Sequence, residues 1–493
     1  MLTPEYSPVT TYRLVKLAPV QTALTVNIAA KRDILSVLSV GVEASVINYN
    51  AASGEMLISG RVNYRLLVTT EEGPQGLSYV ADFNEKIASP FIREKAKAYF
   101  QCTVMDNDYK VNGSKISLNT LVQTLATVIY ANPVECLSSC EGAFVKKQSL
   151  PVVTSASLEC VTVTLSQQLD TAANIQKVLL AESYVSVTDS FISDNVLTVE
   201  GEGAVNLTYL DAEGAVNSQL FSFPFSQETE TALTDQQQCL IACAGTKGTK
   251  IHIDIVGEEE SKELTTELTV EVTLICSEQS EVEVVQDIYS PKNKVVTDYR
   301  QLGGTLLQGR YDYDLQIEET VELDADRTVG VVNALAEVVS ASVAAGGVRA
   351  EGIVQGTVLY VKEGALRSTD FQLPFSRLIE DEYLKADSPL TACAVISNVS
   401  LKEKAKGVEI TVSGKVDVVV TRELAHSVIG SVTEGEALSV STAGFEVCVG
   451  QKGDDLWTTA KKLNMPQEQI TALNPDLVFP LEEAKRIVIY NRI

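Results

Sequence analysis

The residue types that most often carry enzyme chemistry are scarce in this chain. Its 493 residues include two histidines, His252 and His426, and one tryptophan, so a histidine-based catalytic or metal site has little material. No G-x-S-x-G pattern and no G-x-x-x-x-G-K-[ST] phosphate loop occurs. His252 lies in a strand pattern that predicts a solvent-facing side chain, and His426 stands isolated. The sequence therefore predicts no catalytic residue, no cofactor and no enzyme activity.

The nine cysteines do not suggest a paired disulfide framework. Their odd number suits a reducing compartment. Cys136 and Cys140 have three residues between them, as do Cys239 and Cys243. No further Cys or His nearby completes a zinc set, so we predict no metal site.

The charge is strongly acidic, with 39 basic and 65 acidic residues and a formal net charge of −26. Such a surface repels nucleic acid and anionic membranes. The N-terminal residues lack a basic segment followed by an apolar core, so we expect no signal peptide. No run of eighteen apolar residues occurs, which predicts no membrane insertion. Together these features predict a soluble, cytoplasmic protein.

Residues 1–440 contain one long unit three times. They are rich in Val, Thr, Ser, Ile and Tyr, with turn residues every eight to twelve positions, which is typical of all-β structure. A strand pattern recurs that ends in an acidic-Gly turn at Gly73, Gly214 and Gly364. Three further anchors recur with it: Gly60, Gly201 and Gly352; Phe83, Phe225 and Phe375; Cys102, Cys243 and Cys393.

The anchor spacings agree with one another. The glycines are 141 and 151 residues apart, the phenylalanines 142 and 150, and the cysteines 141 and 150. Each copy is domain-sized, so we predict three tandem β-sandwich-like domains, at 1–145, 146–297 and 298–435. A linker at 436–443 leads to a small α+β unit at 444–493. The recurring cysteines are expected to pack in the core as small hydrophobic residues.

The recurring strand has a polar second face in the first two copies and an apolar one in the third. In the first two copies apolar and polar residues alternate, so one face is expected to be buried and the other wet. In the third copy Ile353, Leu359 and Val361 also make the second face apolar. Burial of that face by the domain's own second sheet is favoured over a docking surface between domains.

The last fifty residues have a different pattern. A short strand around Phe445 and Val447 precedes a helix with Leu456, Ala460 and Leu463 on one face. Pro466 opens a second helix, because a proline at the first helical position loses no hydrogen bond. That helix ends at Asn474-Pro475, and 487–490 returns as a strand. The predicted order is β-α-α-β.

This order, with G-D-x-L-W at the first corner and L-N-P at the second, resembles a LysM module. The triplicated unit resembles the SPOCS domain, which is also catalogued as a domain of unknown function. Tandem SPOCS units followed by a LysM resemble the clostridial spore-coat morphogenetic proteins. The resemblance implies a non-enzymatic adaptor, made in the mother cell and located at the forespore surface and spore coat. It would bind the basement-layer ATPase of the coat through its LysM.

The resemblance also implies the site residues, because LysM relatives bind N-acetylated glycans between two loops. The matching residues are Gly453, Asp454, Asp455, Leu456 and Trp457 in the first loop, and Leu473, Asn474, Pro475, Asp476 and Leu477 in the second.

An alternative is open at this point, namely a peptidoglycan-binding LysM with the β domains as a stalk. Asp455 replaces the usual Thr or Ser, and Ala484-Lys485-Arg486 replaces the usual Gly-Gln, which favours a protein ligand. Asp454 is expected to cap the first helix, with Asp455 favouring its dipole. Trp457 is expected in the core of the small unit rather than as a sugar platform.

Overall fold

The computed structural model describes residues 1–169, 175–231, 238–256, 261–344, 346–381, 384, 388–404, 407–438 and 444–490. Within these ranges, the side chains of residues 238, 241–249, 252–256 and 261–263 are not described. The described chain is mainly β, with two short helices near its end, which confirms the predicted mainly-β class. The predicted linker falls largely on residues 439–443, outside the described residues.

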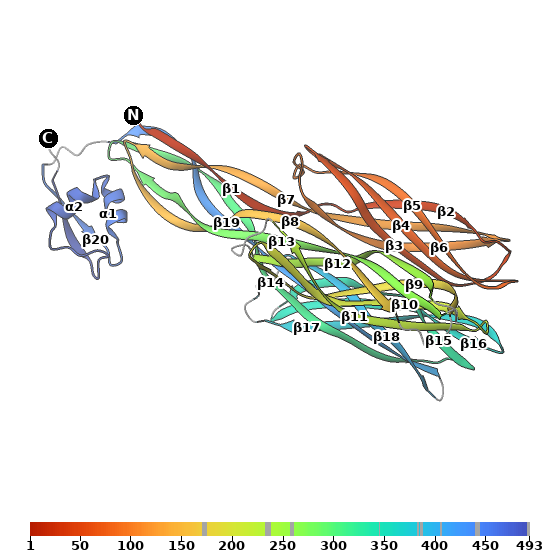
Figure 1. Cartoon of the computed structure of the whole chain (residues 1–493). Coiled ribbons are helices and arrows are strands. Elements are labelled where there is room, and N and C mark those ends of the chain that lie inside the picture. The colour runs from red at the N-terminus through yellow and green to blue at the C-terminus, as the bar shows by residue number, and fades with distance from the viewer. Residues whose placement is uncertain are drawn as a thin grey trace.

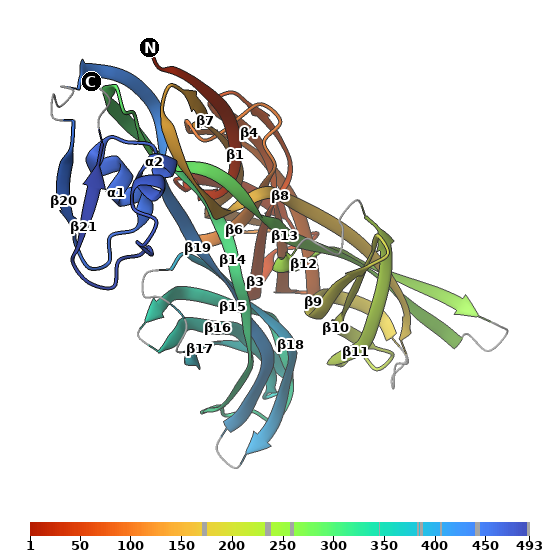
Figure 2. The ribbon, with the colours of Figure 1, turned by 90° about the vertical axis from the view of Figure 1, so that its left-hand side faces the viewer.

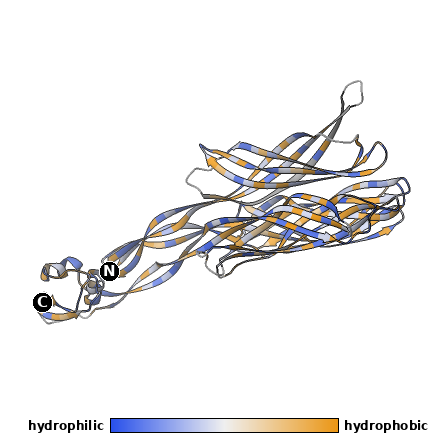
Figure 3. Cartoon of the chain, turned by 90° about the horizontal axis from the view of Figure 1, so that it is seen from below, coloured by the Kyte–Doolittle hydropathy of each residue, from blue (hydrophilic) through white to orange (hydrophobic). Residues whose placement is uncertain are grey.

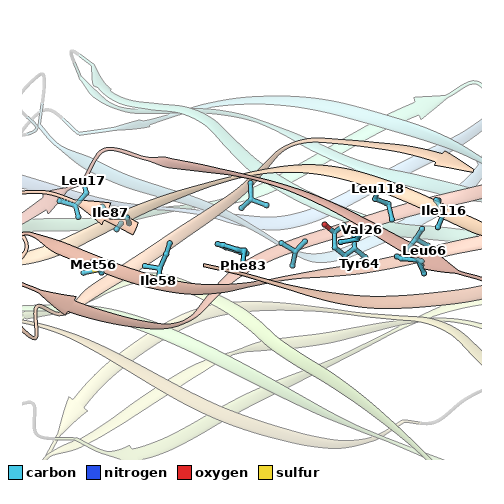
Figure 4. Packing of buried hydrophobic residues seen from close by; sticks show 14 of the residues in the cluster. Leu17, Val26, Met56, Ile58, Tyr64, Leu66, Phe83, Ile87, Ile116 and Leu118 are labelled. Atoms are coloured by element: carbon cyan, nitrogen blue, oxygen red, sulfur yellow. The ribbon is translucent and has the colours of Figure 1, made fainter. Parts of the chain in front are cut away.

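The first repeat consists of a three-stranded and a four-stranded antiparallel sheet that share one core (Figure 4). Its strands are β1 (Thr3–Lys16), β2 (Val20–Ala29), β3 (Ile34–Ala52), β4 (Glu55–Thr70), β5 (Gly73–Ala88), β6 (Ala98–Asn112) and β7 (Lys115–Glu141). One sheet has the order β3-β4-β5, and in the other β2 and β6 flank the first half of β7. Residues such as Tyr64 from β4 and Leu118 from β7 meet between the sheets, both at 0% exposure.

The second and third repeats use the same strand order. The second contains β8 (Phe144–Leu169), β9 (Ile175–Ser193), β10 (Val196–Asp211), β11 (Val216–Glu230), β12 (Gln238–Val256) and β13 (Ser261–Tyr289). The third contains β14 (Asn293–Val321), β15 (Arg327–Ala344), β16 (Gly347–Lys362), β17 (Ala365–Glu380), β18 (Leu390–Lys404) and β19 (Gly407–Ala437). Each has two three-stranded sheets around its own core. The predicted boundaries at 145/146 and 297/298 fall inside β8 and β14.

The glycine and phenylalanine anchors are partners across two strands. Gly60 is opposite Phe83, Gly201 is opposite Phe225, and Gly352 is opposite Phe375. In all three pairs the ring lies so close to the glycine that an added Cβ would overlap it. The ring thus covers the gap that a strand glycine leaves in a sheet, which explains why the two anchors repeat together.

Beyond the paired sheets, each repeat extends into a two-stranded ribbon. Residues 127–141 of β7 pair with β1, 278–289 of β13 pair with β8, and 421–437 of β19 pair with β14. The three ribbons run together away from the sheets as one stalk (Figures 1 and 3). All three contribute to its apolar interior: Val134 and Cys136, Val152 and Val284, Leu302 and Val428.

The sheets of the three repeats also meet one another at the far end of the molecule (Figure 2). One cluster joins the first repeat to the second and third: Leu38 and Leu67; Leu179, Leu180 and Val216; Val332 and Leu359. The predicted burial of the third copy's outer face by its own second sheet is therefore wrong at Leu359, which packs against the other repeats. The predicted wet face of the second copy is wrong for its second half, since Ala204 and Thr208 are at 1% and 0% exposure, whereas Glu202 is exposed as predicted. Contacts between repeats therefore bury side chains that the alternating sequence pattern predicts to be exposed to solvent.

A buried polar network lies beside this junction. Glu182 of β9 is 3% exposed and accepts hydrogen bonds from the Asn333 backbone N–H of the third repeat at 2.6 Å and from Asn206 at 3.4 Å. Asn206 also donates to the Val331 carbonyl at 2.8 Å. Asn333 in turn bonds Ser39 of the first repeat. One carboxyl group and one amide therefore connect all three repeats.

Burial raises the pKa of Glu182, although the charge of Arg65 opposes the effect. The folded chain therefore keeps a proton on this carboxyl at pH values where the unfolded chain has lost it. Its contribution to stability is fully present below the ordinary glutamate pKa and falls as the pH rises toward the raised value. Glu182→Gln should remove this pH dependence of the stability, because glutamine does not titrate. As the pH rises from 4.5 to neutral, the denaturation midpoint of the variant should therefore increase relative to that of the wild type. Identical slopes in the two proteins would contradict this, and Glu283→Gln, on an exposed ribbon position, is the control.

Several expectations about cysteine and histidine need correction. Cys239 and Cys276 are opposite each other on β12 and β13 and form a disulfide, whereas the sequence suggested no pairing. His426 is not isolated, because its Nε2 lies 3.1 Å from the Pro151 carbonyl oxygen of the second repeat. The predictions for His252 and Cys243 concern side chains outside the described set.

The other cysteines of the sequence analysis lie in strands. Cys136 and Cys140 are 3% and 7% exposed and pack inside the stalk. Cys102 and Cys393 are half-buried, and Cys102 packs against the first core as predicted. In the part of the chain that is described, neither helix has the length and apolar character needed to cross a membrane.

Candidate functional site

The C-terminal unit has the predicted order β-α-α-β. It contains β20 (Glu446–Gly450), α1 (Leu456–Leu463), α2 (Gln467–Leu473) and β21 (Lys485–Ile489). The two strands pair antiparallel, and the helices cover one face of this sheet. Its core is formed by Trp457, Ala460, Met465, Ile470, Leu481, Ile487 and Ile489. The unit lies at the end of the stalk (Figures 1 and 2).

The first predicted loop is held by its own two carboxylates. The cap of α1 is Asp455 and not Asp454 as predicted, since its carboxylate accepts from the Thr458 N–H at 2.6 Å. The helix begins one residue later than the sequence suggested. Asp454 instead accepts from the Gln451 N–H and from Lys462, both at 2.9 Å. These bonds from Thr458 and from Lys462 lower the pKa of Asp455 and Asp454 respectively, so both are ionised at neutral pH.

The second predicted loop is fixed by Asn474. Its amide donates to the carbonyls of Ile470 and Val488, both at 2.9 Å, and its oxygen accepts from the Val488 N–H at 2.7 Å. Asn474 is 8% exposed, so this side chain ties the end of α2 to β21 and is not displayed to a ligand. Leu473 and Leu477 pack against the core of the unit, while Pro475 and Asp476 are exposed.

The two predicted loops are not joined directly. Among the described residues, no hydrogen bond connects 453–457 with 473–477. The main chain of Leu481 contacts the first loop instead, accepting from the Gly453 N–H at 2.7 Å and donating to the Asp454 carbonyl at 3.0 Å.

Trp457 has partners that the sequence analysis missed. Its ring is 8% exposed, as expected for a core residue, but part of its cover is the second repeat. The Tyr289 ring lies edge-on at 4.9 Å, and Phe144 stacks on Tyr289 at 5.3 Å. The indole N–H donates to Asp287 at 2.9 Å. These residues are at the outer ends of β8 and β13, where Tyr289 is opposite Phe144.

Further polar contacts cross the same boundary. Lys461 donates to Asp287 at 2.5 Å, Lys146 pairs with Asp455 at 3.3 Å, and the Tyr289 hydroxyl donates to the Met465 carbonyl at 2.9 Å. Burial raises the pKa of Asp287, but bonds from Lys461 and Trp457 outweigh it and leave that pKa below its usual value. Burial raises the pKa of Tyr289 to about 12, so its hydroxyl stays a donor.

These contacts form what we call the terminal joint: Phe144, Lys146, Asp287 and Tyr289 of the second repeat with Asp455, Trp457, Lys461 and Met465 of the C-terminal unit. The two ion pairs are partly exposed, and such pairs contribute about 0–1 kcal/mol each. Tyr289 is 3% exposed, so aromatic burial provides the larger share.

The outer face of the small sheet has the opposite character. Phe445, Val447 and Val449 alternate along the chain and are 63%, 47% and 60% exposed. Val488 is opposite Val447, and Tyr490 just beyond β21 is 50% exposed. We call these five residues the apolar sheet face. Phe445 and Val447 were predicted only as strand residues, and this face was not predicted; their shared parity is the signal that could have identified it.

Comparison of the chain with protein-family models, with curated proteins and with solved structures found no match.

Proposed function

We propose that this protein is a non-enzymatic adaptor of endospore coat assembly, of the SipL-like kind. Its three repeats would be SPOCS-type β-sandwich domains and its C-terminal unit a LysM that docks the basement-layer ATPase of the coat. It would act in the mother-cell cytoplasm, at the forespore surface. The motif resemblance supports this, as does a shape in which the C-terminal unit lies at the end of the stalk, away from the paired sheets of the three repeats.

The observation that carries the proposal is the contrast between the two surfaces of the C-terminal unit. Asp455, Trp457 and Asn474 already have partners within the chain, so these polar groups are not available to hold a glycan. The apolar sheet face is exposed and contiguous across two strands. An exposed apolar patch with polar surroundings is typical of a surface that binds protein.

The test uses the full chain with Val447→Glu and Val449→Glu together, measured against the purified coat ATPase of the sporulating host. Two buried charges in an apolar interface should weaken binding by at least about tenfold. Val339→Glu is the matched control, because Val339 is 67% exposed on the third repeat. Trp457 is a poor probe, since replacing it also disturbs the core of the unit.

Two results would contradict the proposal. One is equal affinity of the paired variant and the control for the ATPase. The other is saturable binding of N-acetylglucosamine oligomers by the full chain, which would support the peptidoglycan-binding alternative with the β domains as a stalk.

A further inference from the structure

The terminal joint covers part of the first predicted loop. Asp455 and Trp457 of that loop both contact the second repeat. The C-terminal unit is therefore not simply tethered to the stalk by the chain that precedes it.

The two sides of the joint are complementary in charge. Asp287 and Lys146 are direct cross-strand partners on the ribbon, and they pair with Lys461 and Asp455 of the unit. The ladder shifts register between Val285 and Asp287. A β-bulge of this kind re-aims the side chains beside it, and here Asp287 reaches the Trp457 N–H and Lys461.

Only the second ribbon is equipped for this contact. Its outermost pair is Phe144 with Tyr289, whereas the corresponding pairs are Thr3 with Glu141 in the first ribbon and Asn293 with Ala437 in the third. The three ribbons otherwise share one architecture. The aromatic end is thus a specific feature of the second repeat and not a property of the repeated unit.

We propose that the tip of the second ribbon is a built-in cover that stays closed over the loop at 453–457 in solution and thereby sets the orientation of the C-terminal unit. The cover fixes the C-terminal unit in one position while the apolar sheet face stays exposed. This inference goes beyond the proposed function, since it holds whether the partner of the unit is a protein or a glycan.

The only tryptophan of the chain reports on the cover directly. In the full-length protein, Asp287→Ala combined with Tyr289→Ala removes the contacts of the second repeat with Trp457 and changes no residue of the C-terminal unit itself. We expect acrylamide to quench Trp457 fluorescence several-fold more strongly in this variant, with emission shifted to longer wavelength. Glu283→Ala, on the same strand and paired with exposed Lys147, should behave as wild type.

A second measurement separates opening from unfolding. The Val488 N–H is bonded to Asn474 within the unit, so its protection from hydrogen exchange should persist when the cover opens. Stronger quenching with this protection retained supports the cover. Unchanged quenching in the double variant, or stronger quenching only with loss of the Val488 protection, would overturn it.

Discussion

Replacing Arg310 with alanine is expected to lower the free energy of unfolding by about 3–5 kcal/mol, the usual cost of removing one partner of a buried ion pair. Arg310 of β14 pairs with Asp417 of β19 at 2.6 Å, and the two side chains are 14% and 9% exposed. It also donates to the Val187 carbonyl of the second repeat at 3.0 Å. Burial raises the pKa of Asp417 while Arg310 lowers it, so the variant leaves a carboxylate without its counter-charge.

Chemical denaturation at neutral pH measures the effect, with Arg32→Ala as the matched control. Arg32 pairs with Glu72 on the surface, both side chains 61% exposed, and its loss should leave the free energy of unfolding nearly unchanged. Replacing both buried partners, by Arg310→Met with Asp417→Leu, should restore most of the stability. Equal effects of Arg310→Ala and Arg32→Ala would show that the buried Arg310–Asp417 pair adds no more stability than an exposed one.

Replacing Phe375 with alanine is expected to cost about 3–5 kcal/mol, the range for a buried Phe→Ala change. Phe375 is 6% exposed and its ring lies against Gly352 across β16 and β17. The truncation opens a cavity over a residue that has no side chain to fill it. The loss should therefore fall in the upper part of the range.

Phe91→Ala is the comparison, because Phe91 is 42% exposed and contacts Tyr130 at the surface. Its effect on the denaturation midpoint should be small. If Phe375→Ala were as mild, the paired anchors would have no energetic basis. Phe83→Ala should repeat the large effect in the first repeat, since Phe83 is 5% exposed, and Phe225→Ala should cost less because Phe225 is only half-buried.

In the candidate site, only the features that depend on residues close together in the sequence could be predicted. The helix at 456–463 follows from periodicity, and the helix at 467–473 from Pro466 and Asn474, because caps and stops act within a few residues. The last strand was predicted at 487–490 and lies at 485–489. The change of cap from Asp454 to Asp455 is an error of one residue at a helix end, where sequence patterns are least sharp. The sequence around Phe144 and Tyr289 did not indicate their contact with the C-terminal unit, because aromatic residues are common in strands of every kind.

The mainly-β class, the three copies and the matching spacing of the Gly and Phe anchors could be predicted from the sequence. They depend on alternation along a strand and on regular spacing between copies. The pairing of these anchors across two strands, the shared interior of the three ribbons, the burial of Leu359 and Asn206 between repeats and the contact of Tyr289 with Trp457 are visible only in the folded chain. The reason is physical: burial on a strand's second face depends on which distant surface packs there, and residues 100 to 300 positions away supply it.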